Sequence, residues 1–278
     1  MLDKQVQEDW IPAMPLVYVK FQEVVKDPES AFKDFADVIG GDTSLTSRLL
    51  KIVNSPFYGF EAKIETIPHA LYIVGTEELH DMVLATSVIN VFRGYLKDLI
   101  DMEAFWRHSI ACALAAKEIA GYLEPAQHEN LYVAGLIHDI GSLVIYNKMP
   151  DVSAGVLKES EKHKVPQHIV EKKAFGYDHS AVGEKVLTSW NIPQRLIESV
   201  TYHHDPFRAP NYHLEAAIIH RADVLAHELN LGDSGTSIAP NLNPEVDTLL
   251  GISEDQLEEI KVEVCNQFDE TVSLLLPG

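Results

Sequence analysis

Residues 132–146 read YVAGLIHDIGSLVIY, an almost wholly apolar run with an ionisable pair, His138 and Asp139, at its centre. A buried charge without a partner costs several kcal/mol, so the pair needs a hydrogen-bond partner or a bound cation. If the run is one helix, the two side chains diverge by about 100°, and both reach a single point only if it lies between them. Two interpretations stay open: a metal ion at that point, or a helix cap or buried hydrogen bond.

Two glycines flank this pair. Gly135 lies on the same face of the run and leaves room for an ion or another helix to approach closely. Gly141 follows the pair and is expected to permit a tight exit from the helix.

Apolar residues recur at spacings of three and four along most of the chain, for example in SLTSRLLKIVNS at 44–55. This period predicts helices. Near the C-terminus, Ser253 and Gln256 form a capping-box pattern that precedes a long apolar stripe, and a further helix is expected to begin around Glu103. The Gly-, Pro-, Ser- and Asn-rich segment 231–247 predicts a long surface loop. We therefore expect an all-α fold of two packed helical subdomains, residues 1–98 and 99–278.

Composition excludes several classes of protein. The 278 residues are 46% hydrophobic, which is enough for a globular core, and they carry a formal net charge of −20. Because binding to nucleic acid requires clustered Lys and Arg, no direct nucleic-acid binding is expected. No apolar run approaches the ~20 residues that cross a bilayer, and the N-terminus lacks a signal-peptide pattern. We expect a cytoplasmic protein without a membrane segment.

Further histidines and aspartates lie outside the central run. His108 shares a helical face with Phe105, Cys112 and Ile119, where a core histidine hydrogen-bonded to a neighbour is the simpler interpretation. The remaining candidates are Asp223, expected to face inward in AIIHRADVLAHEL (217–229), His179 in FGYDHSAVGEKVLTSW (175–190), and His203 with His204 in ESVTYHHDPF (198–207). A surface pair of His227 with Asp223 is an alternative for that helix.

These candidates mean more together than singly. Imidazole and carboxylate groups are the ligands that suit Zn, Mn, Fe and Ni, and here several separate helices supply them. The pattern predicts a divalent-metal site in the core, with the identity of the metal left open.

The order His108, then His138 with Asp139 in HDIG, then Asp223 resembles the H…HD…D pattern of the HD superfamily of metal-dependent phosphohydrolases. GDTSLTSRLLKIVNSPFYGF (41–60) with KIETIPHALYIVG (63–75) resembles the first half of an HDOD domain, and FGYDHSAVGEKVLTSWNIP (175–193) with YHH (202–204) resembles its second half. The resemblance covers roughly residues 12–275. It implies an all-helical fold, a bacterial cytoplasmic setting and a regulatory role.

The same resemblance implies a set of metal ligands. His108, His138, Asp139 and Asp223 would hold one ion, and Asp139 would bridge to a second. By similarity to the HD-GYP phosphodiesterases, His179, His203 and His204 would hold that second ion.

The chain departs from the HD-GYP pattern at two places. Ser142 stands where those enzymes have a lysine after the HDIG glycine, so a phosphate-binding cation is missing. The residues after the paired histidines read DPFRAPNYH (205–213) and lack the Gly-Tyr-Pro signature, which argues against cleavage of cyclic di-GMP.

The expected function is that of a bacterial signal-transduction or regulatory HDOD protein with a retained HD-type divalent-metal site, whose partner is expected to be a signalling protein or a small phosphorylated ligand. One alternative is a metal-dependent phosphohydrolase, a phosphodiesterase or phosphomonoesterase, in which two ions about 3.5–4 Å apart activate water. A second alternative is a metal-free interaction scaffold in which the same residues form a buried polar network. The sequence predicts neither the catalytic residues nor the oligomeric state.

Overall fold

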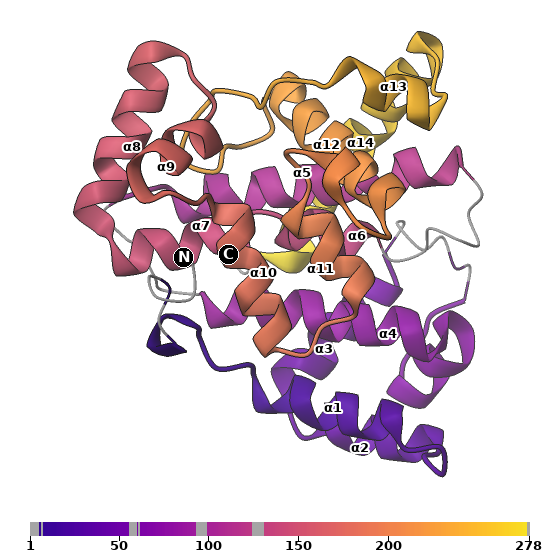
Figure 1. Cartoon of the computed structure of the whole chain (residues 1–278). Helices are drawn as coiled ribbons and strands as arrows, with labels where there is room; N and C mark the ends of the chain where they lie inside the picture. Colours follow the sequence, from indigo (N-terminus) through magenta and orange to yellow (C-terminus); the bar gives the residue numbers. More distant parts are fainter. Residues whose placement is uncertain are drawn as a thin grey trace. The chain divides into compact units, whose positions relative to one another are not determined.

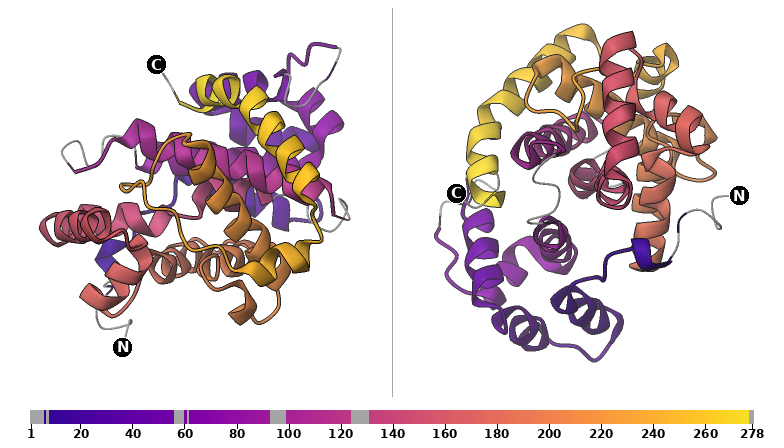
Figure 2. Two further views of the ribbon diagram at one scale, coloured as in Figure 1. Left: turned by 90° about the horizontal axis from the view of Figure 1, so that it is seen from above. Right: turned by 90° about the vertical axis from the view of Figure 1, so that its left-hand side faces the viewer.

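The computed structural model describes residues 6, 8–55, 60, 62–92, 99–123 and 131–276. Every regular element in these ranges is a helix, and they contain no strand (Figures 1 and 2). The prediction of an all-α fold is confirmed. The helices are η2 (Glu8–Trp10), α1 (Leu16–Lys26), α2 (Phe32–Gly40), α3 (Thr43–Val53), α4 (Ile67–Val91), α5 (Met102–Gly121), α6 (Leu131–Ile137), α7 (Ile140–Lys148), α8 (Pro150–His163), α9 (Gln167–Phe175), α10 (His179–Ser189), α11 (Gln194–Thr201), η4 (Pro206–Arg208), α12 (His213–Leu229), α13 (Pro244–Leu250) and α14 (Glu254–Leu275).

The chain divides into two compact units. The first unit comprises Met1–Pro12 and Gly94–Asn266, and the second comprises Ala13–Arg93 and Gln267–Gly278. The subdomain boundary expected at residue 98 falls outside the described residues, so the division into 1–98 and 99–278 stays a prediction.

The second unit contains α1 to α4. Its aromatic core includes Phe21 and Phe35, whose rings meet edge to face at a centroid distance of 5.3 Å. Asp42 begins α3 by accepting a hydrogen bond from the Leu45 amide, as expected of an N-cap. Gly75, with φ of +86°, interrupts the helical geometry of α4, a conformation that glycine adopts without strain.

Small side chains bring the central helices of the first unit together. The face of α5 that packs against α6 and α12 is lined with buried alanines, and α12 contributes buried alanines of its own. A Cβ on Gly135 of α6 would lie 2.7 Å from the Cα of Ala113, so the backbones of α5 and α6 are in contact there. Of the two partners expected at Gly135, an ion or a helix, the structure places a helix.

The segment 231–247 differs from the predicted surface loop. Its last residues already belong to α13, which begins at Pro244, and Ser234 and Thr236 are buried. The Tyr146 hydroxyl donates a 2.8 Å hydrogen bond to the Ser234 carbonyl, and the Thr236 hydroxyl donates one of 2.9 Å to Glu161. These bonds hold the segment against α7 and α8 (Figure 1). Its polar composition serves hydrogen bonding inside the fold.

The capping box before α14 is confirmed. The Ser253 amide donates to the Gln256 side chain at 2.9 Å, and the Gln256 amide donates to the Ser253 hydroxyl at 3.3 Å. None of the described helices is both long and apolar enough to cross a membrane.

Candidate metal centre

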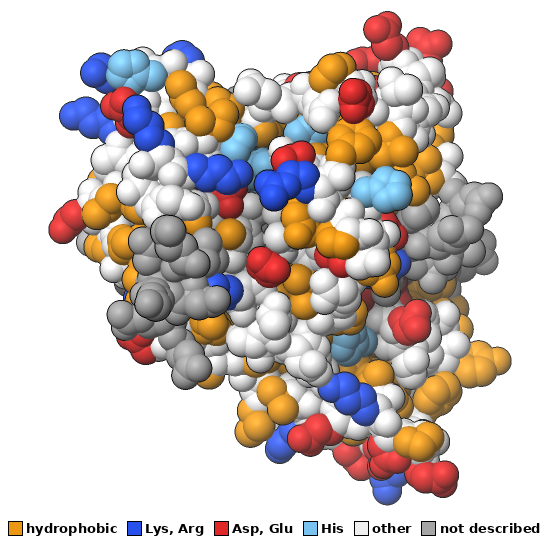
Figure 3. Space-filling model, in the orientation of Figure 1, with side chains coloured by type: hydrophobic (Ala, Val, Ile, Leu, Met, Phe, Trp, Pro, Cys, Tyr) orange, Lys and Arg blue, Asp and Glu red, His pale blue; other side chains and the backbone are white. Residues whose placement is uncertain are grey.

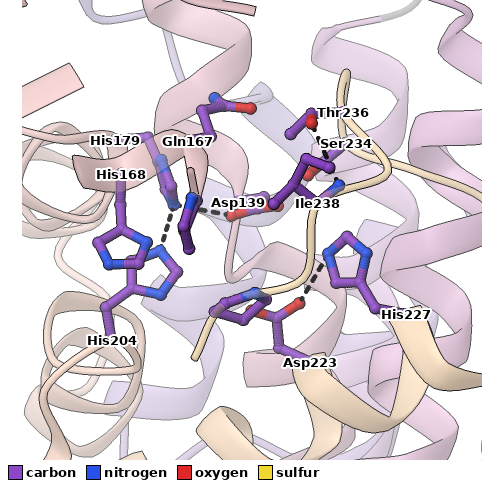
Figure 4. Close-up of a pocket in the computed structure, with 12 residues that line it drawn as sticks. Asp139, Gln167, His168, His179, His204, Asp223, His227, Ser234, Thr236 and Ile238 are labelled. Carbon is purple, nitrogen blue, oxygen red and sulfur yellow. Dashed lines mark hydrogen bonds and ion pairs between the residues drawn. The ribbon is translucent and has the colours of Figure 1, made fainter. Parts of the chain in front are cut away.

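The structure brings all seven predicted site residues together inside the first unit. They come from α5, the α6–α7 junction, the start of α10, the turn after α11, and α12 (Figure 4 labels four of them). Every one of them is buried except His204, which is partly buried. The seven are His108, His138, Asp139, His179, His203, His204 and Asp223.

The central pair does not lie within a continuous helix. α6 ends at Ile137 and α7 begins at Ile140, so His138 and Asp139 form the turn between them. The condition that the run is one helix therefore does not hold at this pair, because one helix ends before it and the next begins after it. Asp139 occupies the N-cap position of α7, but its side chain makes no capping hydrogen bond. The carboxylate is therefore free to face the other site residues.

The sequence predicted that Gly141 permits a tight exit from a helix, but in the structure this glycine permits a close contact between two helices. A Cβ at this position would clash with the His179 carbonyl and would lie 2.6 Å from the Gly183 amide nitrogen. Both contacts are with the backbone of α10, so the glycine lets α7 and α10 touch. Asp178 starts α10 as its N-cap by accepting from the Ala181 amide at 3.2 Å. The close contact sets the first residue of α10, His179, beside Asp139.

Hydrogen bonds to Nδ1 orient three of the histidines. His138 Nδ1 lies 2.7 Å from the Gly135 carbonyl, and His203 Nδ1 lies 2.6 Å from the Val200 carbonyl. His179 Nδ1 lies 2.7 Å from Oε2 of Glu171. Because carbonyl and carboxylate oxygens only accept, each Nδ1 carries the hydrogen and the neutral ring keeps its lone pair on Nε2. In all three residues it is Nε2 that faces the cluster.

One group of ligand atoms gathers around Asp223. Its Oδ1 lies 3.2 Å from His108 Nε2 and 3.8 Å from His138 Nε2, while His138 Nε2 lies 3.3 Å from Asp139 Oδ2. Despite these distances, both ring nitrogens of His108, His138 Nε2 and Asp223 Oδ1 are buried without a hydrogen-bond partner. Since buried polar atoms are nearly always paired, this donor set fits a cation better than it fits a hydrogen-bonded network.

A second group gathers on the other oxygen of Asp139. Oδ1 lies 3.0 Å from His179 Nε2 and 3.8 Å from His203 Nε2, and His204 Nε2 lies 2.9 Å from His179 Nε2 (Figure 4). His203 Nε2 also lacks a hydrogen-bond partner. The two oxygens of Asp139 thus face two different sets of ligand atoms, as a bridging carboxylate would.

The spacing within each group suits coordination. Metal–ligand bonds of about 2.0–2.2 Å place neighbouring ligand atoms roughly 3 to 3.5 Å apart. Most of the shortest contacts in the two groups fall close to this range.

Electrostatics favour the ionised carboxylate. Burial raises the pKa of Asp139, but the neighbouring His138 and His179 outweigh it and hold that pKa well below its usual range. Burial, together with the nearby His138 and His179, lowers the pKa of His203 to about 3. Burial opposes a charge on His138 as well, yet Asp139 raises its pKa well above the ordinary value. A cation that binds His138 therefore has a proton to displace.

His220 stands apart from the ligand groups. Its Nδ1 lies 2.7 Å from the His203 carbonyl, and its Nε2 accepts from the Asn243 amide at 3.1 Å. Both ring nitrogens are used in these contacts, so His220 is a core histidine that supports the turn bearing His203.

The structure adds residues that sequence reasoning did not assign to the site. Gln167, His168 and Glu171 all lie on α9, next to the site. Gln167 and His179 donate hydrogen bonds to Glu171, and the ring of His168 stacks on that of His204 at a centroid distance of 3.9 Å. No local pattern marks these three, because tertiary packing alone brings α9 to the site. His227 did carry a signal, its position one helical turn after Asp223, but the surface-pair interpretation left it outside the predicted ligands.

A small pocket opens onto the ligand atoms. Its walls include Asp139, His204, Asp223 and His227, and the segment 234–240 crosses one side of it (Figure 4). On the face drawn in Figure 3, histidine side chains reach the surface in the upper half, among interspersed basic and acidic groups. Two of the pocket residues, His204 and His227, are partly exposed, so the candidate site is partly accessible from outside.

One curated relative matches most of this chain. An uncharacterized protein of Treponema pallidum (strain Nichols) is 23% identical over 203 residues, which is 73% of this chain. The chain spans only 39% of the length of that relative.

Two solved structures share the fold. An HDOD domain protein of unknown function from Geobacter sulfurreducens is 25% identical, with a TM-score of 0.71 over 99% of this chain and 93% of that one. A protein from Marinobacter aquaeolei VT8, named as a candidate signal transduction protein, is 18% identical with a TM-score of 0.74, over 95% of this chain and 60% of that one.

The family comparison agrees with these structures. The HDOD domain family matches residues 11–206, which is more than half of the chain. The match spans α1 to α11 and the HDIG turn that carries His138 and Asp139. The chain belongs to the HDOD domain family.

Proposed function

We propose that this HDOD chain is a bacterial regulatory or signalling protein built around a divalent-metal site. His108, His138, Asp139 and Asp223 hold one ion, and Asp139 bridges to a second ion held by His179, His203 and His204. The observation that carries the proposal is that the ring nitrogens of His108, Nε2 of His138 and of His203, and one oxygen of Asp223 are buried close together without hydrogen-bond partners.

A metal-free scaffold accounts less well for these atoms. In a buried polar network that only stabilises the fold, donors and acceptors pair with one another. Here neither ring nitrogen of His108 forms a hydrogen bond, although its Nε2 lies 3.2 Å from Asp223 Oδ1. A bound divalent cation would supply the charge that keeps Asp139 and Asp223 ionised in their buried surroundings.

The regulatory role rests on family membership and on what the pocket lacks. The protein of Marinobacter aquaeolei that shares the fold is named for signal transduction. Ser142 is fully buried, so no lysine-like group reaches the pocket from that position. The nearby Lys172 pairs with Asp178 at 2.7 Å. A signalling protein or a small phosphorylated ligand that touches the site from outside suits such a pocket.

A phosphohydrolase is the second candidate, and the arrangement around Asp139 favours it. Two ligand groups share this carboxylate, and the pocket reaches both of them. Paired cations of this kind polarise a phosphoryl oxygen and lower the pKa of water. In that case the protein groups would act by orienting the phosphate ester beside Asp139.

Metal analysis and thermal unfolding test the metal site. Wild type is expected to retain divalent metal through purification and to gain melting temperature on addition of Mn²⁺ or Zn²⁺, because a ligand of the folded state stabilises it. Asp139→Ala should lose both properties. Asp151→Ala, which removes an exposed aspartate of α8, is the control and should behave as wild type. Equal metal content in wild type and Asp139→Ala would refute the proposal.

A panel of phosphate mono- and diesters separates the two functions. With Mn²⁺ or Fe²⁺ loaded, the regulatory proposal predicts no turnover above that of Asp139→Ala. Multiple turnovers by wild type that disappear in Asp139→Ala would replace the regulatory assignment with the phosphohydrolase.

A further inference from the structure

His227 lies beside the candidate metal site but was not among the predicted ligands. It lies on α12, four residues after Asp223, and its side chain is 7% exposed. Its Nε2 is 3.6 Å from Asp223 Oδ1, and its ring centroid is 4.5 Å from that of His108. Figure 4 shows the ring turned toward the Asp223 carboxylate at the edge of the pocket.

Asp223 Oδ1 is the common neighbour of these rings. His108 Nε2 approaches it to 3.2 Å from α5, and His227 Nε2 approaches it to 3.6 Å from α12. The three ligand atoms lie within 4.8 Å of one another. Ligand atoms about 2.1 Å from one ion are separated by roughly 3 to 4 Å, so a single cation can contact all three.

An ordinary ion pair along the helix explains the contact less well. At 3.6 Å, His227 and Asp223 form no hydrogen bond, and Asp223 Oδ1 has no hydrogen-bond partner although the atom is buried. His108 is fully buried, and neither of its ring nitrogens has a hydrogen-bond partner. Two imidazole nitrogens thus lie close to one carboxylate oxygen that has no hydrogen-bond partner, which indicates a ligand between them.

We propose that His227 is an additional metal ligand, which joins His108 and Asp223 around one cation and occupies a coordination position that water would otherwise hold. The inference rests on the proposed metal site and extends it. With imidazoles from two helices beside a carboxylate, this cation is expected to be one that favours nitrogen ligands, such as Zn²⁺, Co²⁺, Ni²⁺ or Fe²⁺, rather than Mg²⁺.

Cobalt provides the test, because the visible absorption of Co²⁺ depends on its ligands. We expect wild type to bind Co²⁺ and His227→Ala to bind it at least about tenfold more weakly, with an altered visible spectrum. His163→Ala is the matched control, since His163 pairs with Glu159 at the same i,i+4 spacing and 3.5 Å, but on an exposed surface. Its affinity and spectrum should equal those of wild type. Mg²⁺ should not compete with Co²⁺ at comparable concentration.

A second variant keeps the test independent of folding defects. In His227→Cys a thiolate replaces the imidazole, and direct coordination would add a sulfur-to-cobalt charge-transfer band that wild type lacks. Wild-type affinity and spectrum in His227→Ala, or no such band in a His227→Cys protein that binds Co²⁺, would overturn the inference. If Asp139→Ala no longer binds Co²⁺ while His227→Ala binds it with wild-type affinity, the metal site stands and only the assignment of His227 as a ligand is wrong. If wild type binds none of these cations, the metal site fails as well.

Discussion

Glu171 is a fully buried carboxylate that is used almost entirely to orient His179. Its Oε2 accepts hydrogen bonds from the backbone amide and from Nδ1 of His179, at 2.8 and 2.7 Å, and its Oε1 accepts from Gln167 at 2.7 Å. Carboxylates that hold the far nitrogen of a metal-binding histidine fix its tautomer and raise its basicity. Glu171 therefore turns Nε2 of His179 toward Asp139.

Replacing this carboxylate should weaken metal binding without removing a ligand. In Glu171→Gln one oxygen can still accept from His179, but the negative charge that raises the basicity of its Nε2 is lost. We expect the affinity for Zn²⁺ to fall about 10- to 100-fold, measured by competition with a chromophoric chelator. Glu159→Gln, on an exposed part of α8, should leave the affinity unchanged. An unchanged affinity in Glu171→Gln would show that His179 does not depend on this contact.

At the scale of helices, the contact of α7 with α10 decides where His179 lies. Gly141→Ala would place a methyl group against the backbone of α10, which can yield only by moving the helix. We expect a loss of about 2 to 3 kcal/mol in the free energy of unfolding, measured with denaturant, together with weaker metal binding. Gly155→Ala is the matched control, because nothing lies within 4 Å of its added Cβ in the middle of α8. That variant should be neutral or more stable by about 0.5 to 1 kcal/mol. Equal stability of the two variants would contradict the proposed close contact.

Glu198 joins α11 to the turn that leads into α12. Its carboxylate accepts from the backbone amides of Asn211 and Tyr212, at 2.9 and 3.0 Å, and from the side chain of Asn211 at 2.8 Å. Burial raises the pKa of Glu198, but these hydrogen bonds lower it more, so the folded protein holds the pKa below the ordinary value of 4.5. The bonds help to fix the approach of His203 and His204 to α12.

The sign of this shift predicts a pH dependence. Because the pKa is lower in the folded state, Glu198 stabilises the protein above about pH 4.5, and the contribution is lost as pH falls through the folded-state pKa. Glu198→Gln should therefore reduce the free energy of unfolding by about 2 kcal/mol at pH 7 and by clearly less near pH 3. Denaturant unfolding at both pH values measures the difference, with the exposed Glu29→Gln as a variant expected to have little effect. A cost independent of pH would argue against an ionised Glu198.

For the molecule as a whole, the helical period predicted the all-α fold, and the resemblance to HD and HD-GYP proteins predicted that the seven residues belong to one site. The period could not show that the chain turns at His138 and Asp139, because apolar residues continue through the turn on both sides. Nor could composition show that segment 231–243 packs inside, since its polar groups bond to Tyr146 and Glu161, which are distant in sequence. Glu171 was missed for the same reason. Sequence reasoning succeeded here where a family motif marked the residues, and it failed for contacts that no local pattern or motif marks.

Two divalent cations are proposed to share Asp139 within the first unit, one of them also bound by Asp223 and the other by His179. The most direct measurement is anomalous diffraction from crystals of the metal-loaded protein, collected at the absorption edge of the bound metal. We expect one anomalous peak within about 2.0–2.3 Å of the ligand atoms of His108, His138, Asp139 and Asp223, and a second peak on the His179 side of the Asp139 carboxylate. Crystals that show no peak at Asp139, with the His108 and Asp223 side chains hydrogen-bonded to each other or to water, would contradict it.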